Sequence, residues 1–129
     1  MDNKNYLKNA IKTDNPNYQE PYDRIDKSTM RLIHSAMGIS TEANEVLDDI
    51  KKHIFYNRQL DKMHLAEELG DVLWYIAIMC DELDVDFDYI MDMNIKKLKN
   101  RYGDKFSNYD ANNRDTKKEN DVINECGVQ

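Results

Sequence analysis

Four acidic residues are spaced in two pairs that could hold a metal ion. Glu42 and Glu45 form one pair, Glu68 and Asp71 the other, and both pairs have i, i+3 spacing. Residues three apart lie on one face of a helix. If two such helices run antiparallel, four carboxylates meet in a small volume, where each raises the pKa of the others unless a cation neutralises them. Oxygen-only ligands favour hard divalent cations, so the hypothesis is a Mg²⁺ site, with Mn²⁺ as a substitute.

Helical periodicity must supply the elements that carry these acids. It predicts a long helix from Ser28 or Thr29 to a loop over 53–61, a second over 62–83 and a third over 87–101. The expected core positions of the first are Leu32, Ala36, Ile39, Ala43, Val46, Leu47 and Ile50. The second is apolar over most of its circumference, which predicts a central helix whose carboxylates are largely buried. No strand pattern occurs, so we expect an all-α bundle of about four helices.

The same pattern divides the chain into a domain and a tail. We expect one helical domain over residues 1–106, in which 1–27 form a short helix and a loop. Residues 107–129 form a polar tail that is partly helical or disordered, with a marginal helix over 114–125. Gly38 stands in the row of acids and costs a helix about 1 kcal/mol relative to alanine. It therefore indicates either a close approach by a ligand or another backbone, or a bend.

Composition excludes several classes of protein. The 129 residues carry a formal charge of −7 without a long basic run, which argues against a nucleic-acid binder. No apolar run is long enough for a membrane span, and the N-terminus does not resemble a signal peptide. Cys80 and Cys126 are far apart, so neither a disulfide framework nor a zinc site is indicated. We expect a soluble, cytoplasmic protein.

A second row of polar residues lies downstream. Asn94, Lys97 and Arg101 fall at i, i+3, i+7 on one helix face, where they could contact phosphate oxygens or simply face solvent. The acidic pairs could likewise be solvated. Trp74 and Tyr75 suit either a core or base stacking. The three histidines are scattered and form no Glu-x-x-His pair with the acids, which disfavours a di-iron bundle.

Three ordered blocks carry a family resemblance. They are GISTEANEVLD at 38–48, EELGDVLWY at 67–75 and NIKKLKNRY at 94–102. Together they resemble the MazG-like family of all-α nucleoside triphosphate pyrophosphohydrolases, over about residues 34–106. The resemblance implies hydrolysis of a (d)NTP between the α and β phosphates, giving a monophosphate and pyrophosphate, in nucleotide-pool house-cleaning.

The resemblance also implies roles for individual residues. The metal ligands would be Glu42, Glu45, Glu68 and Asp71, with Glu42 or Glu45 orienting the attacking water. The phosphate contacts would be Asn94, Lys97 and Arg101, to which Lys52 and Tyr102 are added. Candidates for the base pocket are His34, Gly38, Trp74 and Tyr75, and they do not distinguish one base from another.

Relatives of this kind form homodimers or dimers of dimers, and Ile54, Phe55 and Tyr56 are apolar without an obvious internal partner. We therefore expect an obligate homo-oligomer. Two other functions stay open. One is a phosphoribosyl-ATP pyrophosphohydrolase that shares the metal site. The other is a noncatalytic helical module that binds a metal or a nucleotide, although all four acids are intact.

Overall fold

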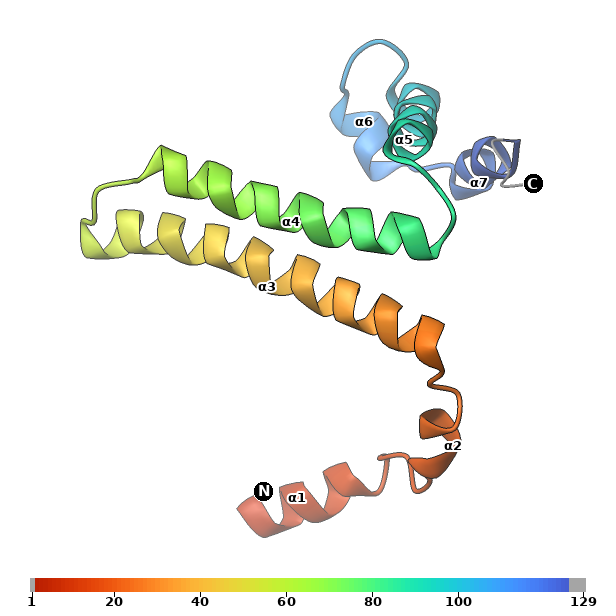
Figure 1. Cartoon of the computed structure of the whole chain (residues 1–129). Coiled ribbons are helices and arrows are strands. Elements are labelled where there is room, and N and C mark those ends of the chain that lie inside the picture. The colour runs from red at the N-terminus through yellow and green to blue at the C-terminus, as the bar shows by residue number, and fades with distance from the viewer. Residues whose placement is uncertain (1, 126–129) are drawn as a thin grey trace.

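Every regular element in the part of the chain that the structure describes, residues 2–125 of a computed structural model, is a helix (Figure 1). The seven helices of this range are α1 (Asn3–Ile11), α2 (Gln19–Tyr22), α3 (Lys27–Tyr56), α4 (Lys62–Glu82), α5 (Phe87–Tyr102), α6 (Asn108–Asn112) and α7 (Thr116–Glu125). The all-α class is confirmed. The predicted number of about four is too low, because α2, α6 and α7 are short helices in segments predicted as loop or tail. Residues 126–129, with Cys126, lie outside the described residues.

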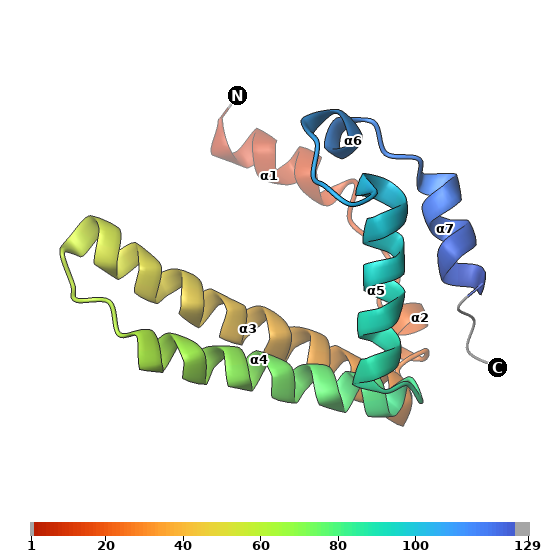
Figure 2. The same cartoon turned by 90° about the horizontal axis from the view of Figure 1, so that it is seen from above.

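The α3–α4 hairpin is the largest unit of the fold. The two helices lie side by side and antiparallel in both views (Figures 1 and 2). Side-chain caps set where they begin, because Asp26 accepts from the Thr29 amide and Asp61 accepts from the amides of Met63 and His64. Asn57 ends α3 in the left-handed conformation, with φ at 53°. The helix boundaries thus follow local chemistry that the sequence displays.

The open end of the hairpin is held by a charged clamp. Arg31 near the start of α3 pairs with Asp81 at 2.6 Å and with Glu82 at 3.0 Å, both at the end of α4. The Ser28 hydroxyl donates to Glu82 at 2.5 Å. These contacts join segments about 50 residues apart in the chain, so they fix which end of α4 meets the start of α3.

Gly38 is a buried position of α3 that faces Tyr75 of α4. A Cβ atom at this position would stand 2.2 Å from ring carbons of Tyr75 on α4. Such a distance is far inside van der Waals contact, so glycine lets the ring pack directly on the α3 backbone. A close approach is therefore present, but the neighbour is an aromatic side chain of α4 and not the ligand or backbone that the sequence suggested.

The outer face of the hairpin is more exposed to solvent than the sequence predicts. Leu69, Leu73 and Trp74 on α4 are each 55% exposed, and Leu47 on α3 is 61% exposed. In a single chain, α4 is therefore covered along one side by α3 and is not a central helix. The row that α3 turns toward α4 includes Ser35 and Gly38, which are buried. The predicted apolar stripe of α3 remains partly open to solvent.

α5 leaves the end of α4 and crosses the hairpin direction (Figure 2). Its main packing partners are α6 and α7, so the tail folds back on α5. Asp86 caps its start, and Gly103 follows its end with φ at 59°. Among the described residues, no helix combines the length and the apolar character needed to cross a membrane.

Candidate metal centre

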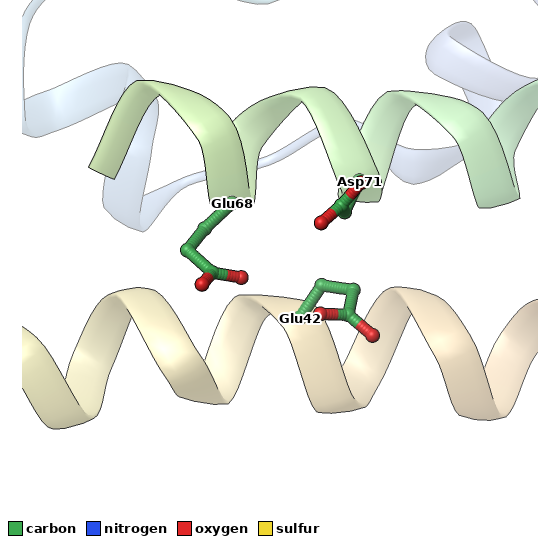
Figure 3. A group of neighbouring side chains, drawn as sticks. All are labelled: Glu42, Glu68 and Asp71. Atoms are coloured by element: carbon green, nitrogen blue, oxygen red, sulfur yellow. The ribbon is translucent and has the colours of Figure 1, made fainter. Parts of the chain in front are cut away.

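Three of the four predicted acids converge between α3 and α4. Glu42 comes from α3, Glu68 and Asp71 from α4, and one carboxylate oxygen of each lies within 4.8 Å of the others. Figure 3 shows the three side chains directed into the space between the two helices. Glu68 is only 8% exposed, while Asp71 lies at the open rim of the group. The antiparallel hairpin therefore produces the convergence that the spacing predicts.

The electrostatics of this group suit a cation. Burial raises the pKa of Glu68, and the neighbouring charges of Glu42, Asp71 and Glu45 raise it further, while His64 opposes them. Three hard oxygen donors within reach of one another match the ligand preference of Mg²⁺. The residues present thus fit the divalent cation that the acid pairs imply.

Glu45 occupies a different position from the other three acids. It is exposed and lies outside the three-carboxylate group, although it is close enough to influence Glu68. It borders a cavity of about 260 Å³ at the closed end of the hairpin. The lining of this cavity consists of Glu45, Asp49, Lys52, Arg58, Gln59, Leu60, Asp61 and His64. Within it, the Lys52 ammonium pairs with Asp48 at 2.5 Å and approaches Asp49 at 3.6 Å.

His64 is a residue of the site that sequence reasoning overlooked. Its Nε2 lies 3.4 Å from both Asp49 and Glu68, and its Nδ1 lies 3.3 Å from Glu67. These carboxylates, led by Glu67, raise the pKa of the imidazole. The i, i+4 spacing between His64 and Glu68 puts both on one helix face. This spacing was visible in the sequence, but the interpretation of the three histidines as scattered did not use it.

The base-pocket candidates form a neighbouring aromatic group. The His34 ring meets the Tyr75 ring edge-on at 5.6 Å, and the Tyr75 ring lies 4.7 Å from that of Trp74. Gly38 is buried beneath Tyr75, whereas Trp74 stays half exposed. His34 and Gly38 precede Glu42 by about two turns and one turn of α3. The group therefore lies along the hairpin from the carboxylates, on the side of the start of α3.

Lys52, on α3, is the predicted phosphate contact that lies near the acids, since it lines the same cavity as Glu45. The other four, Asn94, Lys97, Arg101 and Tyr102, lie on α5, which leaves the hairpin at the end of α4 (Figure 1). The three acids come from the middle of α3 and α4 (Figure 3). The Arg101 guanidinium instead binds Glu119 of α7, at 2.6 Å. Tyr102 packs on Phe106 at 5.5 Å. In the described part of the chain, no ion pair joins Lys97 to the acids, and the uncharged Asn94 lies exposed on α5.

Comparison with known proteins gives two similarities. A family model described as the MazG nucleotide pyrophosphohydrolase domain matches residues 33–106, more than half of the chain. The Gene 37 protein of Mycobacterium phage L5 is 35% identical over 75 residues, which are 54% of this chain and 65% of that protein. The chain thus covers slightly less than two thirds of that relative, whose name states no activity. No solved structure matches the chain.

Proposed function

Because this chain belongs to the family of MazG nucleotide pyrophosphohydrolase domains, we propose that it hydrolyses a nucleoside triphosphate between the α and β phosphates. The products are a nucleoside monophosphate and pyrophosphate, and the role is nucleotide-pool house-cleaning. The convergence of Glu42, Glu68 and Asp71 within 4.8 Å is the observation that carries this proposal. We assign the activity to residues 1–106 and treat 107–129 as an added tail.

Glu42, Glu68 and Asp71 hold Mg²⁺ in this proposal, or Mn²⁺ in its place. Bound there, the ion offsets charge on the phosphate oxygens and lowers the pKa of a water molecule. Glu45 lies outside the group and borders the adjoining cavity. It is therefore free to orient the attacking water and to accept its proton, which makes it a better candidate for the base than Glu42. Lys52, which lines the same cavity, contacts the phosphate chain in this proposal.

The chain acts as a homo-oligomer in this proposal, on the evidence of its surface. A compact monomer of 15.3 kDa exposes about 7,100 Å², whereas this chain exposes 10831 Å². The excess, about 3,700 Å² for one chain, is larger than the roughly 1,000–2,500 Å² that each chain of an obligate dimer commonly buries, so the surface is sufficient for such an interface. Apolar side chains on the outer face of the hairpin contribute to it, among them Leu69, Leu73 and Trp74. A second copy of this chain is the occupant that we propose for that face.

Oligomerisation also offers a source for the phosphate contacts. Asn94, Lys97, Arg101 and Tyr102 lie on α5, away from the carboxylates of the same chain. We propose that a neighbouring copy presents its α5 row to the metal centre, so that each site uses two chains. The base would then contact the group formed by His34, Gly38, Trp74 and Tyr75, in which the Trp74 ring is 55% exposed.

A substrate panel with a matched pair of variants tests the function. All canonical NTPs and dNTPs, dUTP and phosphoribosyl-ATP are incubated with the protein and Mg²⁺, and pyrophosphate release is scored against single-phosphate release. Glu68→Ala should reduce turnover at least about 100-fold, since it removes a metal ligand. Asp121→Ala, which removes an exposed acid of α7, should not.

The outcomes separate the alternatives. Pyrophosphate release from a nucleotide that disappears only in Glu68→Ala supports the proposal and names the base. Release from phosphoribosyl-ATP alone would identify that compound as the substrate, in place of a nucleoside triphosphate. No release from any of these compounds, by a folded protein that binds Mg²⁺, would overturn the enzymatic function.

A further inference from the structure

A buried carboxylate between two arginines joins the tail to α5. Glu119 on α7 is 4% exposed. It accepts from Arg101 Nε at 2.7 Å and Nη2 at 2.6 Å, and from Arg114 Nη2 at 2.7 Å. The Arg101 bonds are bidentate, a geometry in which guanidinium recognises both carboxylates and phosphates. The side chain of Arg101 is 15% exposed and that of Arg114 is 50% exposed. Of the two arginines, Arg101 is therefore shielded from solvent and Arg114 is accessible.

The charges in this cluster do not balance. Two guanidinium groups surround a single carboxylate, which leaves one positive charge in excess. Lys97 lies one turn before Arg101 on α5, and no ion pair involves it among the described residues. The pKa of Glu119 falls to about 2, mainly because Arg101 and Arg114 donate to it. An anion with two or more negative charges would match this group of cations better than one carboxylate does.

α7 depends on this contact for its position. It has 10 residues, and isolated helices shorter than about 12–15 residues are marginal in water. Besides the Glu119 pairs, Asn100 Nδ2 of α5 donates to the Lys118 carbonyl of α7, at 3.1 Å. The main packing partner of α7 is α5. A ligand that displaces Glu119 from Arg101 therefore removes a bidentate, charged link between α7 and α5.

We propose that Arg101 and Arg114 form a polyphosphate site that Glu119 occupies, so that the phosphate chain of a nucleotide and α7 compete for the same two guanidinium groups. The identity of the anion rests on the proposed function, while the competition itself does not. α7 then acts as an internal competitor: it lowers the affinity for phosphate when docked, and it is released when phosphate binds.

Inorganic tripolyphosphate is the probe that tests the competition. Hydrogen–deuterium exchange of the full-length protein is followed over residues 115–125 while tripolyphosphate is added without divalent metal, so that the carboxylate site does not bind it. We expect amide protection in α7 to fall as the probe saturates. Sodium chloride at the same ionic strength should leave the protection largely intact, since chloride is monovalent, and this separates displacement from screening.

Two variants sharpen the test. Glu119→Gln keeps the shape but removes the charge, so α7 should lose protection without ligand and tripolyphosphate should bind at least about tenfold more tightly, because no competitor remains. Asp121→Asn neutralises an exposed acid on the same helix and should behave as the parent protein. A thermal melt shows whether Glu119→Gln is folded, and if it is not, the titration of the parent protein decides alone.

Each result of these experiments either supports or overturns the proposal. Loss of α7 protection with tripolyphosphate supports the site even if no nucleotide is hydrolysed, in which case only the proposed function fails. Unchanged protection at saturating probe would overturn the proposal, and so would equal affinity in a folded Glu119→Gln variant. Arg101 would then be a structural anchor for the tail, and the phosphate contacts would be left to other residues of α5.

Discussion

At the scale of single residues, the proposed function assigns separable roles to the acids of the hairpin. Glu42 belongs to the three-carboxylate group, whereas Glu45 is exposed beside the cavity. Glu45→Gln should therefore lower kcat about 10²- to 10⁴-fold, as expected for loss of a general base, with Mg²⁺ affinity nearly unchanged. Glu42→Gln should weaken Mg²⁺ binding itself. Calorimetric titration of Mg²⁺ alongside steady-state kinetics distinguishes the two, and equal loss of Mg²⁺ affinity in both variants would refute the assignment.

Gly38 and Gly70 provide a matched pair for the contact with Tyr75. A methyl group at Gly38 would overlap the Tyr75 ring, while one at Gly70 would meet nothing within 4 Å. Gly38→Ala should therefore destabilise the fold by about 1–3 kcal/mol through overpacking. Gly70→Ala should stabilise it by about 0.5–1 kcal/mol, because alanine favours the helix. Urea denaturation measures both changes, and a neutral Gly38→Ala would show that the ring moves aside freely.

The convergence of the acids could be predicted from the sequence, whereas the partner of Arg101 could not. The i, i+3 spacing was enough to bring Glu42, Glu68 and Asp71 together once the hairpin was assumed. The partner of Arg101 could not be predicted, because Glu119 lies 18 residues away in a polar tail and only the docking of α7 makes them meet. Spacing within one helix is encoded locally, while pairing between helices is not.

At the scale of elements, α7 should respond to acid. The pKa of Glu119 lies at about 2, below its ordinary value of 4.5. A lowered carboxyl pKa contributes stability that is complete above the ordinary value and is lost as the pH falls toward the lowered one. The docking of α7 should therefore weaken between about pH 4.5 and pH 2. Amide chemical shifts of residues 116–125 would follow this change, and the Glu119→Gln variant, which has no carboxyl group to titrate there, should lack it.

The boundaries of the long helices were predictable because their caps are visible in the sequence. Asp26, Asp61 and Asp86 each precede a helix and accept from its first amides. The short helices α2 and α6 were not predicted, since four or five residues carry no clear periodicity. Helical periodicity therefore predicted those helices that span several turns.

At the scale of the whole molecule, the exposed apolar face should control assembly. Leu73→Glu puts a charge on the outer face of α4, where the side chain is 55% exposed. We expect it to shift the protein toward monomer in sedimentation equilibrium, with the α3–α4 hairpin still helical by circular dichroism. Asn112→Glu adds the same charge on α6, away from the hairpin, and should leave the assembly unchanged. An unaltered oligomer in Leu73→Glu would exclude this face from the interface.

The arrangement of the helices was the least predictable level. The sequence indicated a central α4, but in one chain its outer side remains open because α5 packs on α6 and α7 instead. Hydrophobic pattern shows that a face needs cover and does not show whether the cover comes from the same chain. The pattern of an amphipathic helix therefore predicts which face needs to be buried, but it does not predict which element covers that face.

The hairpin has a consequence for the order in which the protein is made. The three carboxylates and the clamp formed by Arg31, Asp81 and Glu82 all lie within residues 27–82. Synthesis from the N-terminus completes this segment before it reaches α5 and the tail. The proposed cation ligands therefore leave the ribosome ahead of Glu119 and its partner Arg101. If these ligands hold a metal ion as proposed, a nascent chain can acquire the ion before it contains the competing carboxylate.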